Sequence, residues 1–242
     1  MQPIVFIHGF MGHASDWDEV RAHLPDSNST AINIKPATNW QASIESLANS
    51  IAPGSILVGY SMGARLALGV AVEIPTKCSG LVFISGNPGL ESASERNARA
   101  NADEEIAARI EQATGDSSLM ESFLNDWYQA TVFASLPEII RRQEIQRKLN
   151  RAQKTWPALL RTNSVSQQPN YWPRLKDISI PTLIVAGQRD EKYKEITERF
   201  QTTASSHHLK TEILPAGGHM VHREQPTKLA ALIRDFVKQT QL

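Results

Sequence analysis

The chain of 242 residues lacks several features that would assign it to a specialised class of protein. Cys78 is its single cysteine, which rules out an internal disulfide and fits a reducing compartment. Its 25 lysine and arginine residues balance its 25 aspartate and glutamate residues, so no net charge draws it to nucleic acid or to an anionic membrane. No apolar run approaches about 20 residues, and no charged leader precedes the first apolar segment. These absences predict a cytoplasmic protein that binds neither nucleic acid nor membrane.

What the chain does have is a regular alternation of apolar runs and helical patterns. Six apolar runs predict strands, at residues 3–7, 30–34, 55–58, 80–85, 181–187 and 209–214. Because segments with helical spacing separate most of these runs, the alternation predicts an α/β protein with a mostly parallel sheet flanked by helices.

The alternation is interrupted between residues 91 and 166, where strand patterns are absent and polar helices are expected. The expected helices span residues 94–112, 117–128, 137–149 and 154–163. We interpret residues 91–166 as a helical cap inserted over the site, and residues 1–90 together with 167–242 as the core domain.

The sequence Gly59-Tyr60-Ser61-Met62-Gly63 has the pattern of a nucleophile elbow. A predicted strand precedes it, and an apolar helical segment at 66–71 follows it. A strand that turns directly into a helix holds the middle residue in a strained backbone conformation, and only small flanking residues let the two elements approach so closely. The pattern therefore predicts that Ser61 stands above the sheet, at the positive N-terminus of the next helix.

An acid and a histidine follow the last two predicted strands. Asp190 comes soon after the run at 181–187, and His219 lies in a glycine-rich turn after the run at 209–214. A serine hydroxyl needs a histidine to take its proton, and the histidine needs a carboxylate to orient the imidazole. The order Ser61, Asp190, His219 is that of α/β-hydrolases, so we predict these residues as a catalytic triad.

Two backbone amides are expected to complete this site. The loop after the first strand reads His8-Gly9-Phe10, and the N–H of Phe10 is the natural partner of the Met62 N–H in an oxyanion hole. His222, close behind the predicted catalytic histidine, is a candidate for lining the site. The pair His207-His208 has no accompanying acid or cysteine pattern, so we interpret it as a solvated loop and expect no metal site.

Several arginines suggest what kind of ligand the site could take. Arg65 lies one helical turn after the predicted nucleophile, Arg96 and Arg99 open the cap, and Arg147 lies in a later cap helix. Arginines in a cap are usually solvated, but several that converge near the serine of a neutral chain would suit a carboxylate-rich substrate. Trp127-Tyr128 could be cap core or a stacking wall over an unsaturated ring.

Several stretches of the sequence together match one family of enzymes. They are His8-Gly9-Phe10-Met11-Gly12 with Asp16-Trp17, Gly59 to Arg65, Asn87-Pro88-Gly89-Leu90, Asp126-Trp127-Tyr128-Gln129 with Val132-Phe133-Ala134-Ser135-Leu136, Gly187-Gln188-Arg189-Asp190, and Gly217-Gly218-His219 with His222-Arg223-Glu224. On these stretches the chain resembles, across nearly its whole length, the 2-succinyl-6-hydroxy-2,4-cyclohexadiene-1-carboxylate (SHCHC) synthase family, lyases with the α/β-hydrolase fold in menaquinone and phylloquinone biosynthesis. The elbow and the histidine loop occur throughout that fold, whereas the Pro-Gly-Leu stretch and the two stretches between 126 and 136 are not generic to it and lie in the cap.

The chain also departs from the pattern of that family. Ala64 replaces the second glycine of the usual Gly-Gly-Arg, and Lys35-Pro36-Ala37-Thr38 replaces a Pro-Gly-His-Gly loop. The first two strands of the fold are missing, so a trimmed sheet is expected.

The resemblance implies roles for ten residues. Ser61, Asp190 and His219 match the family's triad, and Phe10 and Met62 match its oxyanion-hole amides. The positions that contact substrate are matched by Tyr60, Arg65, Arg99, Trp127 and Arg147. Lys148 competes with Arg147 under a shift of one residue.

The implied reaction eliminates pyruvate from 2-succinyl-5-enolpyruvyl-6-hydroxy-3-cyclohexene-1-carboxylate. Ser61, activated by His219, would act as the base, the oxyanion hole would hold the enolate, and the arginines would bind carboxylates. The resemblance implies no cofactor, and the protein is expected as a monomer or small homo-oligomer. A serine hydrolase of a small carboxylated substrate, acting on an ester or a carbon–carbon bond, needs the same triad and is the alternative. A ligand-binding protein without turnover is the third class.

Overall fold

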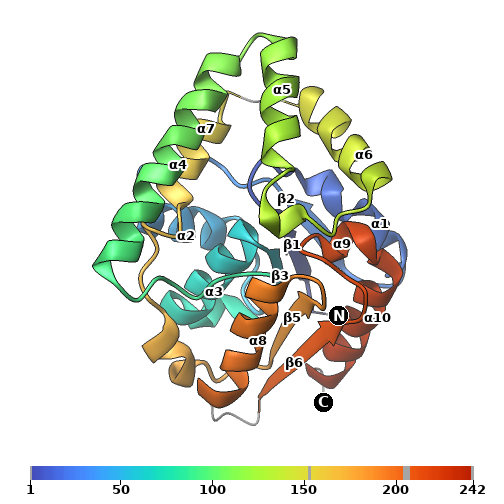
Figure 1. Ribbon diagram of the computed structural model, residues 1–242. Coiled ribbons are helices and arrows are strands. Elements are labelled where there is room, and N and C mark those ends of the chain that lie inside the picture. Colours follow the sequence, from blue (N-terminus) through green and yellow to red (C-terminus); the bar gives the residue numbers. More distant parts are fainter. Residues whose placement is uncertain (1, 152–153, 204–207, 241–242) are drawn as a thin grey trace.

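Six parallel strands form one sheet in the described part of the chain, residues 2–151, 154–203 and 208–240 of a computed structural model (Figure 1). The sheet confirms the α/β fold predicted from the apolar runs. Its spatial order is β2-β1-β3-β4-β5-β6. The strands are β1 (Ile4–Ile7), β2 (Ser29–Ile32), β3 (Ser55–Tyr60), β4 (Cys78–Ile84), β5 (Thr182–Gly187) and β6 (Leu209–Leu214).

Helices fill the connections between the strands. The α-helices are α1 (Asp18–Ala22), α2 (Trp40–Asn49), α3 (Met62–Glu73), α4 (Ala93–Ala113), α5 (Ser117–Trp127), α6 (Glu138–Leu149), α7 (Trp156–Asn163), α8 (Glu191–Thr203), α9 (Val221–Glu224) and α10 (Pro226–Thr240). Short 3₁₀ turns are η1 (Ala14–Trp17), η2 (Pro75–Lys77), η3 (Thr131–Phe133) and η4 (Trp172–Asp177).

The strands alternate their side chains between two buried layers, one on each face of the sheet. One layer includes Phe6, Val58 and Val82 from the strands with Val20 of α1 and Ile233 of α10. On the other face, α2, α3 and α8 contribute to a second layer, whose members include Ile44, Leu68 and Phe200. Both faces are covered, which explains why the inner strands β1, β3, β4 and β5 read as continuous apolar runs without a polar face. The edge strands β2 and β6 are only partly buried.

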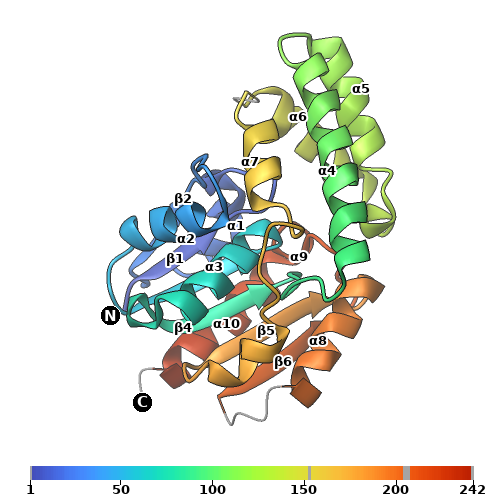
Figure 2. The same ribbon diagram turned by 90° about the vertical axis from the view of Figure 1, so that its left-hand side faces the viewer.

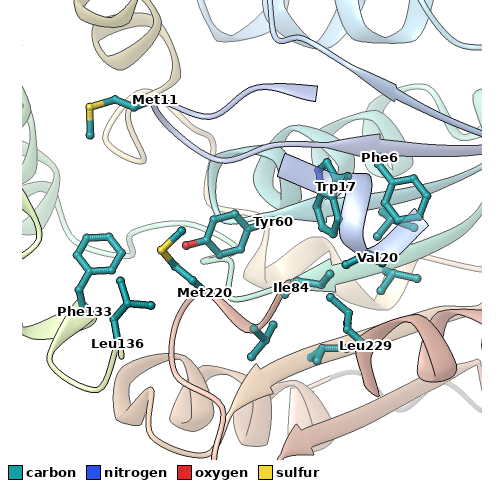
Figure 3. Packing of buried hydrophobic residues seen from close by; sticks show 14 of the residues in the cluster. Phe6, Met11, Trp17, Val20, Tyr60, Ile84, Phe133, Leu136, Met220 and Leu229 are labelled. Atoms are coloured by element: carbon teal, nitrogen blue, oxygen red, sulfur yellow. The ribbon is translucent and has the colours of Figure 1, made fainter. Parts of the chain in front are cut away.

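Helices α4 to α7 stand together at one end of the sheet, above the ends of its strands (Figures 1 and 2). The apolar layer of α1 and α10 continues into this block, because the same buried cluster includes Ile110, Phe123 and Leu124. In Figure 3, Tyr60 and Met220 lie between Trp17 of the core and the cap residues Phe133 and Leu136, and all five belong to the same cluster of buried side chains. The cap is thus packed onto the core through a shared apolar layer.

The predicted catalytic segments follow strands whose carboxyl ends meet beneath the cap. Ser61 follows β3, and β5 and β6 are paired side by side with Gly187 opposite Leu214, immediately before the segments that carry Asp190 and His219. No helix in the described residues is both long and apolar enough to cross a membrane.

Candidate active site

The turn at Ser61 has the strained geometry that the Gly-x-Ser-x-Gly pattern predicts. Ser61 has φ +52° and ψ −110°, directly between β3 and α3. A Cβ at Gly59 would collide with the backbone of Gly63 and Ala64, and a Cβ at Gly63 would collide with the Ile7 carbonyl. Both glycines are therefore required by close backbone approach, and the turn presents Ser61 to the space above the sheet.

The predicted acid and histidine of the triad are in contact. The Nδ1–H of His219 donates a hydrogen bond of 2.7 Å to Oδ2 of Asp190, and both side chains are buried. With its proton on Nδ1, the imidazole has its Nε2 lone pair available to accept a proton. Ser61 and His219 line the same cavity, so the chain brings together the three residues that sequence order predicted.

The two predicted oxyanion-hole residues, Phe10 and Met62, line that cavity too. Met62 is the first residue of α3, where a backbone N–H has no acceptor within the helix. Phe10 lies in the turn after β1, which is closed by a hydrogen bond of 3.1 Å from the Gly12 N–H to the Gly9 carbonyl. This arrangement leaves a helix N-terminus and a loop beside Ser61, where negative charge can be stabilised.

The cavity has a volume of about 450 Å³ and lies between the sheet edge and the cap. Aromatic rings form much of its wall, including Tyr60, Trp127 and Phe133. The Trp127 ring meets Phe10 edge-on with centroids 5.7 Å apart, and it lies 6.0 Å from Phe133. Trp127 therefore belongs both to the cap packing and to the cavity wall, so the two interpretations of its sequence position are compatible.

Arg65 lines the cavity while it is itself buried. Its guanidinium donates to the Asn163 carbonyl at 2.7 Å and to Oε1 of Gln168 at 3.2 Å, and it lies 5.8 Å from the Trp40 ring. Burial, with a further contribution from Arg99, lowers the pKa of Arg65 to about 10, so the group stays charged at neutral pH. Because both of these acceptors are neutral, a carboxylate ligand would stabilise the buried charge of Arg65 further.

Arg99 also reaches the cavity, from helix α4. Its Nε donates at 2.8 Å to Oδ2 of Asp103, one turn later on the same helix, and 39% of its side chain is exposed. Arg96, one turn earlier, has a different position, because its guanidinium donates to the carbonyls of Gln168 and Leu90 at 2.8 and 2.7 Å. Arg99 thus faces the cavity, while Arg96 ties the start of the cap to neighbouring backbone.

The expectation for Arg147 differs from its position in the structure. Arg147 lies outside the Ser61 cavity, on a neighbouring depression, and its guanidinium is 3.6 Å from Glu19. Lys148 lines the Ser61 cavity instead. Successive side chains on a helix point about 100° apart, so Arg147 and Lys148 project from different sides of α6. The structure favours the alternative, Lys148, over Arg147.

Lys148 is buried among groups that keep it charged. Its Nζ lies 3.2 Å from Oε2 of Glu144 and 5.8 Å from the Tyr128 ring centroid. Burial alone would lower the pKa of Lys148, but Tyr128 and the carboxylates of Glu144 and Asp16 raise it above its usual value. The cavity therefore has a fixed positive charge on its α6 side.

Two cavity residues, Lys192 and Tyr193, had no role predicted from the sequence. Both open α8, within three residues of Asp190, and the Tyr193 ring lies 4.7 Å from His219. Burial and the nearby Arg99 lower the pKa of Lys192. Their closeness in sequence to a predicted triad member is the signal that could have identified them.

His222 lines the cavity, as its position near His219 suggested. Its ring lies 4.2 Å from Tyr60, and burial lowers the pKa of His222 to about 3. His222 is therefore uncharged at neutral pH. Among the described residues no group of three or more His, Cys, Asp or Glu side chains is placed to hold a metal ion. Of the pair interpreted as a solvated loop, His207 lies outside the described residues.

Comparison with known proteins adds to this geometry. Residues 4–232 match the model of the alpha/beta hydrolase family. The chain is 31% identical over 248 residues to SHCHC synthase from Enterobacter sp. (strain 638), covering 97% of this chain and 91% of that protein. The structure of MenH from S. aureus aligns with a TM-score of 0.90 at 28% identity, covering 100% of this chain and 95% of that one. A thermophilic esterase from Thermogutta terrifontis aligns with a TM-score of 0.75 at 18% identity, over 100% of this chain and 91% of its own, and shows the fold alone.

Proposed function

This chain belongs to the alpha/beta hydrolase family and, within it, to the SHCHC synthases, and from that premise we propose its reaction. It eliminates pyruvate from 2-succinyl-5-enolpyruvyl-6-hydroxy-3-cyclohexene-1-carboxylate to give SHCHC in menaquinone or phylloquinone biosynthesis. The similarity to curated SHCHC synthases extends over nearly the whole length of both chains, including the cap.

One observation carries the assignment of substrate: four cationic side chains line the cavity that contains Ser61. They are Arg65, Arg99, Lys148 and Lys192. The carboxylates that line the same cavity are Asp16 and Asp103. The proposed substrate has three carboxylates, on the ring, the succinyl arm and the enolpyruvyl group. An excess of positive charge in a cavity of a chain with zero net charge suits such a ligand.

The proposed mechanism uses Ser61 and His219 together as the base. His219 Nε2 draws the proton from the Ser61 hydroxyl as Ser61 takes the C2 proton beside the succinyl ketone. Asp190 holds the imidazole in the required tautomer and stabilises the imidazolium. The amides of Phe10 and Met62 stabilise the enolate oxygen.

Electrons then move through the ring. The pair from the C2–H bond is held first in the enolate. As the enolate returns to the ketone, that pair forms the C2=C3 double bond, the C3=C4 pair moves to C4=C5, and the C5–O bond breaks. The leaving group departs as enolpyruvate, which takes a proton and becomes pyruvate, while the ring becomes the 2,4-diene. No water is consumed, so the step is an elimination. The aromatic wall at Tyr60 and Trp127 suits stacking on the conjugated ring.

A serine hydrolase remains the second candidate, because Ser61 beside His219 could equally form an acyl-enzyme. The two functions are separated by incubating the protein with the enolpyruvyl substrate and, separately, with simple aryl esters. The lyase releases pyruvate faster than the enzyme-free rate and hydrolyses the esters poorly. Fast ester hydrolysis without pyruvate release would favour the hydrolase instead.

Arg99 provides a test of the carboxylate assignment. We expect Arg99→Ala to lower kcat/KM for pyruvate release by about tenfold, the value of one charge-assisted hydrogen bond at a partly exposed site. Arg99 is 39% exposed but Asp103 is buried, so the substitution also leaves a buried carboxylate without its cationic partner and should lower the free energy of unfolding. Measuring kcat/KM and the melting temperature separates the two effects.

Arg96→Ala is the matched control on the same helix. Because Arg96 bonds to the backbone of Leu90 and Gln168, its loss should lower the melting temperature and leave kcat/KM per folded molecule unchanged. If Arg99→Ala instead behaves like Arg96→Ala, Arg99 is a structural residue of the cap.

A further inference from the structure

Glu224, the last residue of α9, bonds to the backbone on both sides of His219. Its Oε2 accepts a hydrogen bond of 2.8 Å from the Gly218 N–H, and its Oε1 accepts one of 3.0 Å from the Met220 N–H. A single carboxylate therefore brackets the residue that the proposed mechanism uses as its proton acceptor.

The loop that carries His219 is packed closely against this carboxylate. A Cβ at Gly218 would lie 3.0 Å from both oxygens of Glu224 and would collide with Oγ of Ser135. On the side facing β5, the Arg189 N–H donates to the Gly217 carbonyl at 2.8 Å. The loop is thus held from two sides, by the end of β5 and by Glu224.

Both carboxylate oxygens of Glu224 accept hydrogen bonds from backbone amides of this loop. Among the described residues, no lysine or arginine forms an ion pair with it. Burial raises the pKa of the Glu224 carboxyl, while the bonds from the Gly218 and Met220 amides and the nearby His219 oppose that rise. The same electrostatic environment includes Asp190, whose charge adds to the rise. A partly buried carboxylate with two backbone donors as its partners is suited to fixing backbone geometry.

We propose that Glu224 is a positioning residue, which sets the place of the His219 ring by fixing the backbone amides on either side of it. The proposal rests on the proposed function, in which His219 moves the proton. Asp190 fixes the rotation of the His219 side chain through the hydrogen bond to Nδ1. Glu224 instead fixes the backbone of the two peptide units that flank His219. Both contacts are needed because proton transfer depends on the distance between Oγ of Ser61 and Nε2 of His219.

Glu224→Gln tests this role with little change in size. A glutamine side chain has one acceptor oxygen and one NH₂ donor, so it can satisfy one of the two amides and opposes the other. We expect kcat for pyruvate release to fall by about tenfold to a hundredfold, the effect of a small misplacement of a reacting group, with KM changed by less than about twofold. Glu224→Asp keeps the charge on a shorter side chain and should also lower kcat. It provides the same test if the glutamine variant does not fold.

Gln225→Ala is the matched control, because Gln225 also bonds to this loop but away from His219. Its Nε2 donates to the Pro215 carbonyl at 2.7 Å. If hydrogen bonds to the loop served only stability, the variants at 224 and 225 would behave alike. We expect Gln225→Ala to keep kcat within about twofold of the wild type. Equal effects in the two variants, or a Glu224→Gln kcat within twofold of the wild type, would overturn the proposal.

The proton NMR resonance of the His219 Nδ1–H provides a readout that needs no substrate. The hydrogen bond to Asp190 should place this resonance far downfield, and it should shift or broaden in Glu224→Gln but not in Gln225→Ala. An unchanged resonance in Glu224→Gln would contradict the positioning role. If the wild type releases no pyruvate, the proposed reaction fails, and the resonance still decides the role of Glu224.

Discussion

Replacing Ser61 by alanine will lower kcat for pyruvate release by at least about a hundredfold and by up to roughly ten-thousandfold, the range for a positioned general base. His219→Ala should cause a loss of the same order. The double variant should be little worse than either single variant, because groups that act as a unit are not additive. Ser61→Ala should leave the fold intact, because serine and alanine both have a Cβ and the strain of φ +52° is therefore the same in the two proteins. The measurement is pyruvate release with thermal unfolding of the same samples.

Ser85 offers a matched serine for this experiment. It is buried just after β4, the strand next to β3, and it also has a positive φ, +47°. Its Oγ has no hydrogen-bond partner among the described residues, and it is not part of the cavity lining described around Ser61. Ser85→Ala should therefore retain activity. Near-wild-type turnover in Ser61→Ala would remove the serine from the mechanism.

The second large effect is expected at Lys148. Lys148→Met removes a buried cation from the cavity wall and should lower kcat/KM by about tenfold to a hundredfold, the value of a charge-assisted hydrogen bond to a carboxylate. The substitution also leaves Glu144 without one of its cationic neighbours, so some stability should be lost. For this reason kcat/KM is measured per folded molecule. Lys148→Arg, which keeps the charge, should recover part of the activity.

Arg147→Met is the control at the adjacent position. Arg147 has the same sign of charge, but it faces Glu19 outside the cavity, so kcat/KM should change by less than about twofold. The comparison distinguishes a specific contact from the general attraction of a positive cap. If the two substitutions exchanged their effects, the arrangement of α6 described here would be wrong.

The strands and the elbow could be predicted because their signals are local. The four inner strands, β1, β3, β4 and β5, are buried on both faces, and so each reads as an apolar run regardless of what packs against it. The elbow likewise depends on Gly59 and Gly63, which the backbone approach requires whatever the substrate is. The contact between Asp190 and His219 was predictable for a related reason, since parallel strands bring their carboxyl ends to one edge of the sheet.

The cap side of the site was harder to predict, because it depends on helix rotation. Arg147 and Lys148 are neighbours in the sequence with similar charge, and only the packing of α6 decides which of them faces Ser61. Lys192 reaches the cavity because α8 begins at Glu191, directly after the segment that carries Asp190. The two bonds of Glu224 depend on the turn that joins α9 to the histidine loop. Such contacts are set by tertiary packing, and a residue pattern does not encode them directly.

Elimination by the Ser61 and His219 pair can be distinguished from hydrolysis by turnover of the enolpyruvyl substrate in water enriched in oxygen-18, with Ser61→Ala as the background. We expect pyruvate and SHCHC in equal amounts, well above that background, with SHCHC at its unlabelled mass because no water enters the reaction. Release of succinate that has gained a solvent oxygen, with no pyruvate above the background, would contradict it and identify an acyl-enzyme hydrolase.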